Sequence, residues 1–166
     1  MIYEPREDSF LLGKFIKDYA KGKVLDMGCG SGYLALIALE KTKDVLAADI
    51  NPEAVNLCKK KGITAIVSDL FSNIKGKFDL IIFNPPYLPE DPDEDSESKL
   101  VTTDNGVIER FLKEVKKYLS VNGKCLMVYS SLSVNVPGLA KKNGLKFKIL
   151  KEEPLFFENL YVILIE

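Results

Sequence analysis

The chain has 166 residues, a formal net charge of −1 and 46% hydrophobic residues, values typical of one globular domain with a substantial core. No apolar run reaches membrane-spanning length, and the charged first eight residues do not resemble a secretory leader. The three cysteines are odd in number and scattered, which argues against a disulfide framework or a zinc site and favours a reducing cytoplasm. Histidine is absent, so the commonest general base and metal ligand is missing.

Apolar patterns of helical and extended period alternate along the chain. We expect helices at residues 10–19, 33–41, 51–62, 104–119 and 132–143, and strands at residues 23–27, 44–49, 63–67, 78–83 and 123–129. Pro137 is expected to interrupt the last helix. Two final strands, at residues 145–150 and 155–165, are expected to form an antiparallel hairpin joined around Pro154. The pattern predicts an α/β fold in a single domain, residues 1–166, with a short helical extension over residues 1–22.

A glycine loop, Gly28-Cys29-Gly30-Ser31-Gly32, follows the first expected strand and precedes a helical pattern. Such a loop begins a βαβ nucleotide site, because glycines let the backbone approach a ligand closely. The dinucleotide fingerprint would need its third glycine at Tyr33. Asp26, just before the loop, would also repel a pyrophosphate, whereas an acid suits a sulfonium or an amino group. The loop therefore favours S-adenosylmethionine over NAD, whose redox chemistry these residues oppose.

The next two strand ends carry acids. Asp49 lies 21 residues beyond the first loop glycine, where an acid can accept hydrogen bonds from both ribose hydroxyls. Asp69 could accept a hydrogen bond from an adenine amino group, with Leu70 and Ile50 flanking the ring. Either acid alone could be a helix cap or a solvated loop residue. At successive strand ends, however, they lie where ligands bind in open α/β sheets.

The segment Asn84-Pro85-Pro86-Tyr87 follows the apolar strand at residues 78–83. Two prolines fix the turn, which would lift the Asn84 side chain and the Pro85 carbonyl off the carboxyl edge of the sheet. Both groups are hydrogen-bond acceptors and could grip the two hydrogens of a planar NH2 group. Tyr87 could cover the face of a flat group. A rigid turn without chemistry is the alternative reading of this segment alone.

An acidic segment follows directly, with six acids between Pro89 and Ser98. It is expected to form the lip of the acceptor site, although a solvated loop would have the same composition. Nucleic-acid enzymes need cations near the phosphates, so an acidic lip argues against duplex DNA. It favours a basic protein surface as the substrate.

The glycine loop, the acid after the second strand and Asn84-Pro85-Pro86-Tyr87 together resemble class I, S-adenosylmethionine-dependent methyltransferases that modify planar nitrogens. The opening Tyr3-Glu4-Pro5-Arg6-Glu7-Asp8-Ser9-Phe10-Leu11-Leu12 is similar to that of the HemK-type glutamine methyltransferases of the short archaeal and eukaryotic branch. That branch methylates the glutamine side-chain amide in the Gly-Gly-Gln motif of class I translation release factors. The resemblance implies a Rossmann-like, seven-stranded, mostly parallel sheet in the order 3-2-1-4-5-7-6, with helices on both faces.

The resemblance also implies a role for individual residues. Ser9 and Asn84 would lie beside the cofactor. Its methionine part would be held by Asp26, Gly28 and Gly30. Its ribose would be held by Asp49, and its adenine by Asp69, Leu70 and Ile50. The acceptor amide would be held by Asn84 and the Pro85 carbonyl and bounded by Pro86 and Tyr87, with Asn84, Pro85 and Tyr87 as the catalytic residues. Transfer would be in-line and dominated by positioning, with no metal and no base residue. The stretch from Leu88 to Gly106 departs from the family pattern, which makes the substrate-facing contacts the weakest part of the correspondence.

Members of this branch work with a small zinc-binding activator protein that adds a strand to the sheet edge. The third strand, residues 63–67, is expected at that edge and is almost wholly apolar, so we expect it to be covered. The flanking Lys59–Lys61 and Asp69 could instead protect it.

Several acceptors remain open at this stage. An amino-group methyltransferase for adenine N6 or guanine N2 of RNA or DNA is the main alternative, because Asn-Pro-Pro-Tyr suits exocyclic amines equally well. A cofactor-binding subunit without its own activity is another. A lysine acceptor would need a base to remove its proton, and the sequence offers no evident base.

Overall fold

The structure is a computed structural model that describes residues 2–87 and 104–166. Its elements in chain order are α1 (Glu7–Tyr19), β1 (Val24–Met27), α2 (Tyr33–Leu39), β2 (Val45–Asp49), α3 (Pro52–Lys60), β3 (Thr64–Val67), β4 (Phe78–Phe83), α5 (Val107–Tyr118), β5 (Leu119–Ser130), α6 (Val136–Lys142), β6 (Phe147–Pro154) and β7 (Asn159–Ile165). The acidic segment between Pro89 and Ser98 lies outside the described residues, so its place at the acceptor site stays a prediction.

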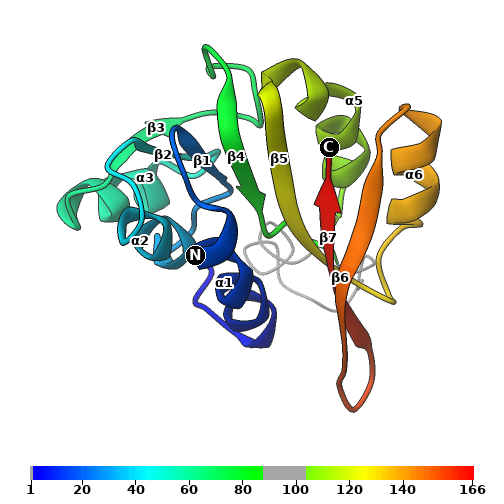
Figure 1. Cartoon of the computed structure of the whole chain (residues 1–166). Coiled ribbons are helices and arrows are strands. Elements are labelled where there is room, and N and C mark those ends of the chain that lie inside the picture. The colour runs from blue at the N-terminus through cyan, green and yellow to red at the C-terminus, as the bar shows by residue number, and fades with distance from the viewer. Residues whose placement is uncertain (1, 88–103) are drawn as a thin grey trace.

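Within the described residues the strands form one seven-stranded sheet in the order β3-β2-β1-β4-β5-β7-β6, as expected (Figure 1). Strands β1 to β5 pair in parallel, while β7 runs antiparallel to both β5 and β6. The register pairs Met27 with Ala48 on one side and with Phe83 on the other. The carboxyl ends of β1, β2 and β4 therefore meet at one edge, which brings the glycine loop, Asp49 and Asn84 together.

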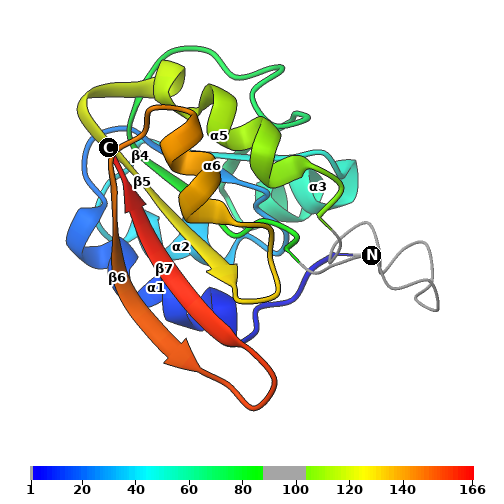
Figure 2. The ribbon, with the colours of Figure 1, turned by 90° about the vertical axis from the view of Figure 1, so that its right-hand side faces the viewer.

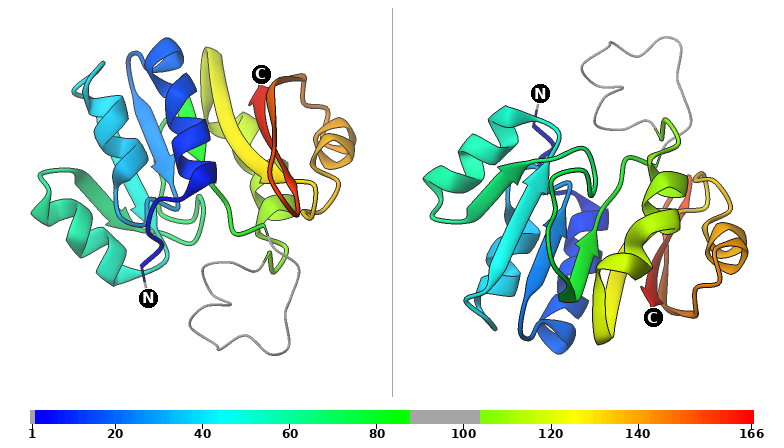
Figure 3. Two further views of the ribbon diagram at one scale, coloured as in Figure 1. Left: turned by 90° about the horizontal axis from the view of Figure 1, so that it is seen from below. Right: turned by 90° about the horizontal axis from the view of Figure 1, so that it is seen from above.

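Two apolar cores cover the two faces of the sheet. Alternate strand residues such as Val24 and Leu80 join α1, α2 and α3 in one core, while Leu25 and Ile81 join α5 and α6 in the other. Figures 2 and 3 show these helix layers on opposite sides of the sheet, and Figure 1 shows β3 and β6 at its two ends. Burial on both faces explains why the central strands read as continuous apolar runs rather than as alternating patterns.

The main differences from the sequence predictions lie at element ends. Helix α1 begins three residues before the predicted Phe10. Pro137 does not interrupt a helix: it occupies the first turn of α6, where no intrahelical N–H is needed, and the Asn135 side chain caps that turn by accepting a hydrogen bond from Gly138 N. Pro154 is not the hairpin turn either, since it pairs with Asn159 and the turn lies at residues 155–158.

Candidate active site

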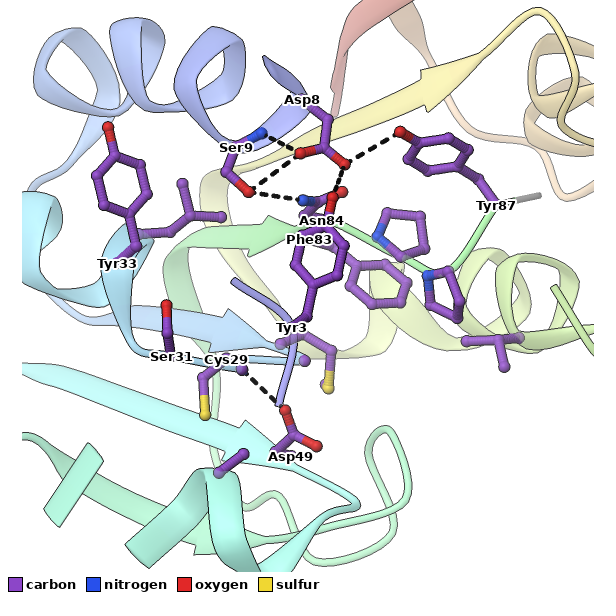
Figure 4. Close-up of a pocket in the computed structure, with 18 of the residues that line it drawn as sticks. Tyr3, Asp8, Ser9, Cys29, Ser31, Tyr33, Asp49, Phe83, Asn84 and Tyr87 are labelled. Atoms are coloured by element: carbon purple, nitrogen blue, oxygen red, sulfur yellow. Dashed lines mark hydrogen bonds between the residues drawn. The ribbon is translucent and has the colours of Figure 1, made fainter. Parts of the chain in front are cut away.

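A cavity of about 410 Å³ opens at the carboxyl ends of the parallel strands, within the usual size range of ligand sites. Its walls come from the N-terminal segment, the glycine loop, the ends of β2 and β3, the turn after β4, the start of α5 and the β6–β7 turn. The structure brings eleven of the twelve predicted site residues to this cavity, namely Ser9, Gly28, Gly30, Asp49, Ile50, Asp69, Leu70, Asn84, Pro85, Pro86 and Tyr87. Figure 4 shows Ser9, Asp49, Asn84 and Tyr87 among them.

Asp26 is the predicted residue that the structure places elsewhere. It is fully buried beneath the loop, where its Oδ2 accepts a hydrogen bond from Ala35 N at 3.0 Å. Its Oδ1 has no hydrogen-bond partner among the described residues. Burial is the main reason why the pKa of Asp26 lies well above its ordinary value. In this structure Asp26 supports the start of α2 and does not line the cavity, so its contact with the methionine part of the cofactor stays a prediction.

Asp49 ties the glycine loop to the end of β2. Its Oδ2 accepts a hydrogen bond from Gly30 N and its Oδ1 accepts one from Asn51 N, both at 2.9 Å. Gly30 has a φ of +49°, and a Cβ there would lie 3.2 Å from the Tyr3 carbonyl oxygen. Burial raises the pKa of Asp49, and the backbone N–H donors oppose this rise. Each carboxylate oxygen keeps acceptor capacity after one hydrogen bond, so Asp49 can still bind hydroxyls.

The end of β3 forms a tight polar turn. Ser68 Oγ donates a hydrogen bond to the Leu70 carbonyl at 2.6 Å, and Leu70 adopts a left-handed φ of +46°, which is uncommon for a branched residue. The Asp69 carboxylate accepts a hydrogen bond from Arg110 Nη2 of α5 at 2.7 Å. Arg110 also lines the cavity, and the sequence analysis missed it because nothing in the α5 pattern distinguishes it from other exposed helix charges.

A buried carboxylate joins the N-terminal segment to the turn after β4. Asp8, only 2% exposed, accepts hydrogen bonds at Oδ2 from the hydroxyls of Tyr3 at 2.6 Å and Tyr87 at 3.0 Å. Its Oδ1 accepts from Ser9 N at 2.5 Å and from Ser9 Oγ at 3.1 Å (Figure 4). Burial and the nearby Asp8 charge raise the pKa of both tyrosines far above their ordinary value, so both hydroxyls remain protonated donors.

The same network orients the Asn84 amide. Asn84 Nδ2 donates to Ser9 Oγ at 3.1 Å, and Ser9 Oγ in turn donates to Asp8, which can only accept. The nitrogen of the amide therefore faces Ser9. Asn84 Oδ1 is buried and has no hydrogen-bond partner among the described residues. An unpaired buried acceptor costs about 1–3 kcal/mol, which makes this atom a candidate acceptor for a donor from a ligand.

Tyr3 and Asp8 line the cavity but were not predicted as site residues. Both stand in the opening segment that carries the family resemblance, and this was the available signal. No spacing rule connects them with Tyr87, which is 79 residues beyond Asp8. Only the fold brings these side chains together.

The charges around the cavity are mostly negative. The lining contains Glu7, Asp8, Asp49, Asp69 and Glu158 but only two cations, Arg6 and Arg110. Arg110 is paired with Asp69. An acidic surrounding favours a cationic ligand over a polyphosphate.

This chain is similar to known methyltransferases. The Methyltransferase small domain family matches residues 7–143. A Methanocaldococcus jannaschii protein named "Putative protein N5-glutamine methyltransferase" is 38% identical over 98% of this chain and 90% of its own length. The Ribosomal RNA small subunit methyltransferase C of Buchnera aphidicola is 30% identical over 87% of this chain, which spans 42% of that protein.

Solved structures show the same fold. A chain of the E. cuniculi Mtq2–Trm112 complex, described as responsible for methylation of the eRF1 translation termination factor, has a TM-score of 0.78 and 24% identity, covering 99% of this chain and 98% of its own. A Bacteroides fragilis S-adenosylmethionine-dependent methyltransferase, solved with S-adenosyl-L-homocysteine, has a TM-score of 0.70 and 21% identity. The match covers 93% of this chain and 76% of that protein. With its match over residues 7–143, this chain belongs to the Methyltransferase small domain family.

Proposed function

We propose that this protein is an S-adenosylmethionine-dependent N-methyltransferase that modifies the glutamine side-chain amide in the Gly-Gly-Gln motif of a class I release factor. The observation that carries the proposal is the position of Asn84 in the cavity wall, with a side-chain Oδ1 that accepts no hydrogen bond from the described residues. The M. jannaschii relative, matched over nearly its whole length, and the E. cuniculi complex support the same acceptor.

The residues of the cavity fit the cofactor. The glycine loop exposes backbone at one wall, Asp49 keeps acceptor capacity for ribose hydroxyls, and Ile50 and Leu70 offer apolar surface for a ring. When bound, S-adenosylmethionine would supply an electrophilic methyl group on a positive sulfonium. Asp26 would act from below the loop, by holding the first turn of α2 through Ala35.

At the acceptor, Asn84 Oδ1 and the Pro85 carbonyl would accept the two amide hydrogens. Asp8 and Ser9 hold the Asn84 amide in the orientation that presents Oδ1 as an acceptor. Tyr87, fixed by its own hydrogen bond to Asp8, would bound the site. Rate enhancement would come mainly from positioning, and the proton would leave to water after transfer.

A second candidate is methylation of an exocyclic amine of ribosomal RNA, and the similarity to Ribosomal RNA small subunit methyltransferase C favours it. The acidic cavity lining opposes this candidate, because RNA binding needs cations at the phosphates.

We also propose a small, zinc-binding partner protein at the free edge of β3. The edge position of β3, and the E. cuniculi structure of two associated proteins, support this partner. A termination factor acts where ribosomes work, so the proposal places the protein in the cytoplasm. No helix within the described residues is long and apolar enough to cross a membrane.

The test measures transfer of a labelled methyl group to a release factor and, in separate reactions, to total RNA and duplex DNA, each with and without a Trm112-type protein. We expect label on the release factor alone. Asn84→Ala and Asn84→Asp should lower kcat/KM by at least about 100-fold, as expected for loss of a group that positions the acceptor. Asn56→Ala, an exposed asparagine on α3, is the matched control and should behave as wild type. Label on RNA with an unlabelled release factor would contradict the proposal and support the second candidate.

A further inference from the structure

Two phenylalanines at the turn between β6 and β7 are exposed to solvent. Phe156 is 91% and Phe157 is 86% exposed, and their rings contact each other edge to face with centroids 4.6 Å apart. Among the described residues, the other exposed large apolar side chains are at most 56% exposed, except Val121 at 91%. Adjacent exposed aromatic rings are typical of surfaces that bind a partner.

Hydrogen bonds hold this turn in place. Leu155 N donates to the Glu158 carbonyl at 2.8 Å, which closes the turn. At its base, Ser131 N donates to the Asn159 carbonyl at 2.8 Å, and Asn159 N donates to Ser131 Oγ at 3.0 Å. The Glu158 carboxylate also accepts a hydrogen bond from Ser130 Oγ. The two rings are therefore presented from a preorganised turn, which lowers the entropy cost of binding.

The turn is continuous with the candidate active site. Leu155, Glu158 and Leu160 line the cavity, while Phe156 and Phe157 lie outside it. The hairpin projects beyond the carboxyl end of β4, on the side of the sheet where the cavity opens (Figure 1). A molecule that placed one group in the cavity could therefore contact the two rings with its neighbouring surface.

The charge of the turn selects among possible occupants. Residues 151–161 contain three glutamates and one cation, Lys151, whose ammonium lies 3.5 Å from the Glu153 carboxylate, so the net charge of this hairpin end is negative. Phosphate groups of RNA or of an anionic membrane would be repelled there. Two copies of the same acidic turn would also repel each other in a symmetric contact. A protein surface with basic residues around an apolar side chain has the complementary character.

We propose that the Phe156–Phe157 turn is a docking surface for the protein that carries the acceptor, and that it binds an apolar side chain flanked by basic residues near the acceptor loop. This inference rests on the proposed function, because it takes the substrate to be a folded protein. It assigns substrate selection to a surface outside the cavity.

The experiment compares wild type with Phe156→Ser/Phe157→Ser and with Val121→Ser. Val121 is equally exposed but lies near the amino end of β5, away from the carboxyl ends of the parallel strands where the cavity opens, so it controls for loss of exposed apolar surface. Steady-state methylation of a class I release factor and direct binding of that factor are measured for all three proteins. We expect the double variant to raise KM and Kd for the release factor at least about tenfold, with kcat and S-adenosylmethionine affinity within twofold. Val121→Ser should match wild type.

The outcomes separate the two proposals. If wild type methylates the release factor and the double variant has an unchanged KM, the docking surface is overturned and the proposed function stands. If wild type neither binds nor methylates the factor, both fail together. Loss of sedimentation with anionic vesicles, or loss of a dimer, in the double variant alone would reassign the turn to a membrane or to self-association and overturn the inference.

Discussion

Asp8 is the residue that connects the N-terminal segment to the acceptor side of the site. It accepts hydrogen bonds from two tyrosine hydroxyls and from Ser9. Ser9 Oγ in turn accepts a hydrogen bond from Asn84 Nδ2. A carboxylate can accept at both oxygens without offering a competing donor. It is therefore suited to fix the orientation of its partners, and we interpret Asp8 as a positioning residue.

Replacing Asp8 by asparagine tests this role. One acceptor oxygen becomes an NH2 group, which cannot accept from hydroxyls, so at least one donor loses its partner. We expect kcat to fall by about 10–100-fold and the free energy of unfolding to fall by about 1–3 kcal/mol, while S-adenosylmethionine affinity changes little. Steady-state kinetics and urea unfolding measure these effects.

Tyr3→Phe provides the graded comparison for this experiment, because it removes one donor and leaves the carboxylate intact. It should lose less activity than Asp8→Asn. Equal kcat values for wild type and Asp8→Asn would refute a positioning role.

Asp26 should make the stability of the protein depend on pH. Its pKa in the folded state is raised mainly by burial above the ordinary value of 3.8. Between these two pKa values the folded state binds the proton and the unfolded state does not, so stability falls as pH rises through this window. Asp26→Asn can keep the acceptor for Ala35 N without a buried charge.

We therefore expect the free energy of unfolding of Asp26→Asn to exceed that of wild type by a margin that grows as the pH rises above the ordinary pKa of 3.8. The chain contains no histidine, so no imidazole titration overlaps with that of Asp26. Urea unfolding curves at several pH values measure the margin. A margin independent of pH would show that Asp26 does not carry a raised pKa.

Among the elements, β3 makes the most specific prediction. It lies at the edge of the sheet, and the side chains of Thr64 and Val67 are exposed there. We expect Thr64→Lys/Val67→Lys to abolish copurification with the small partner proposed for this edge. Stability should change by less than about 0.5 kcal/mol, since both positions are on the surface.

Strand β6, at the opposite edge, supplies the control. Ile149 is 42% exposed and Val67 is 43% exposed, so Ile149→Lys makes a comparable change on the other edge. Copurification should survive Ile149→Lys. Its loss in both variants, or its survival in both, would rule out a partner specific to β3.

The elements could largely be predicted from the sequence, because the spacing of apolar residues within a short segment is enough to indicate a helix or a strand. The β4 prediction, residues 78–83, matches the structure at both ends. The predictions were wrong at two prolines, each of which is compatible with two structures. Pro137 could break a helix or lie in its first turn, and the Asn135 cap shows that it lies in the first turn. Pro154 could make the turn or end the strand, and its pairing with Asn159 decides for the strand.

At the scale of the whole molecule, the strand order places distant motifs at one cavity. The glycine loop, Asp49, Asp69 and Asn84 could be predicted because each follows a strand, and parallel strand ends share an edge. The contact of Asp8 with Tyr87 and the pairing of Arg110 with Asp69 could not be predicted, because the partners are 79 and 41 positions apart and no periodic pattern relates them. The interpretation of residues 1–166 as one domain stays a prediction.

The proposed function is tested most directly by locating the methyl group after reaction of the protein with S-adenosylmethionine and a class I release factor. Tandem mass spectrometry would compare the wild-type factor with its Gly-Gly-Gln Gln→Asn variant. We expect one methyl group on the side-chain nitrogen of that glutamine, and none on the variant. A methyl group on lysine, on the backbone or on the Gln→Asn variant would contradict the assignment of Asn84 as the clamp for a glutamine amide.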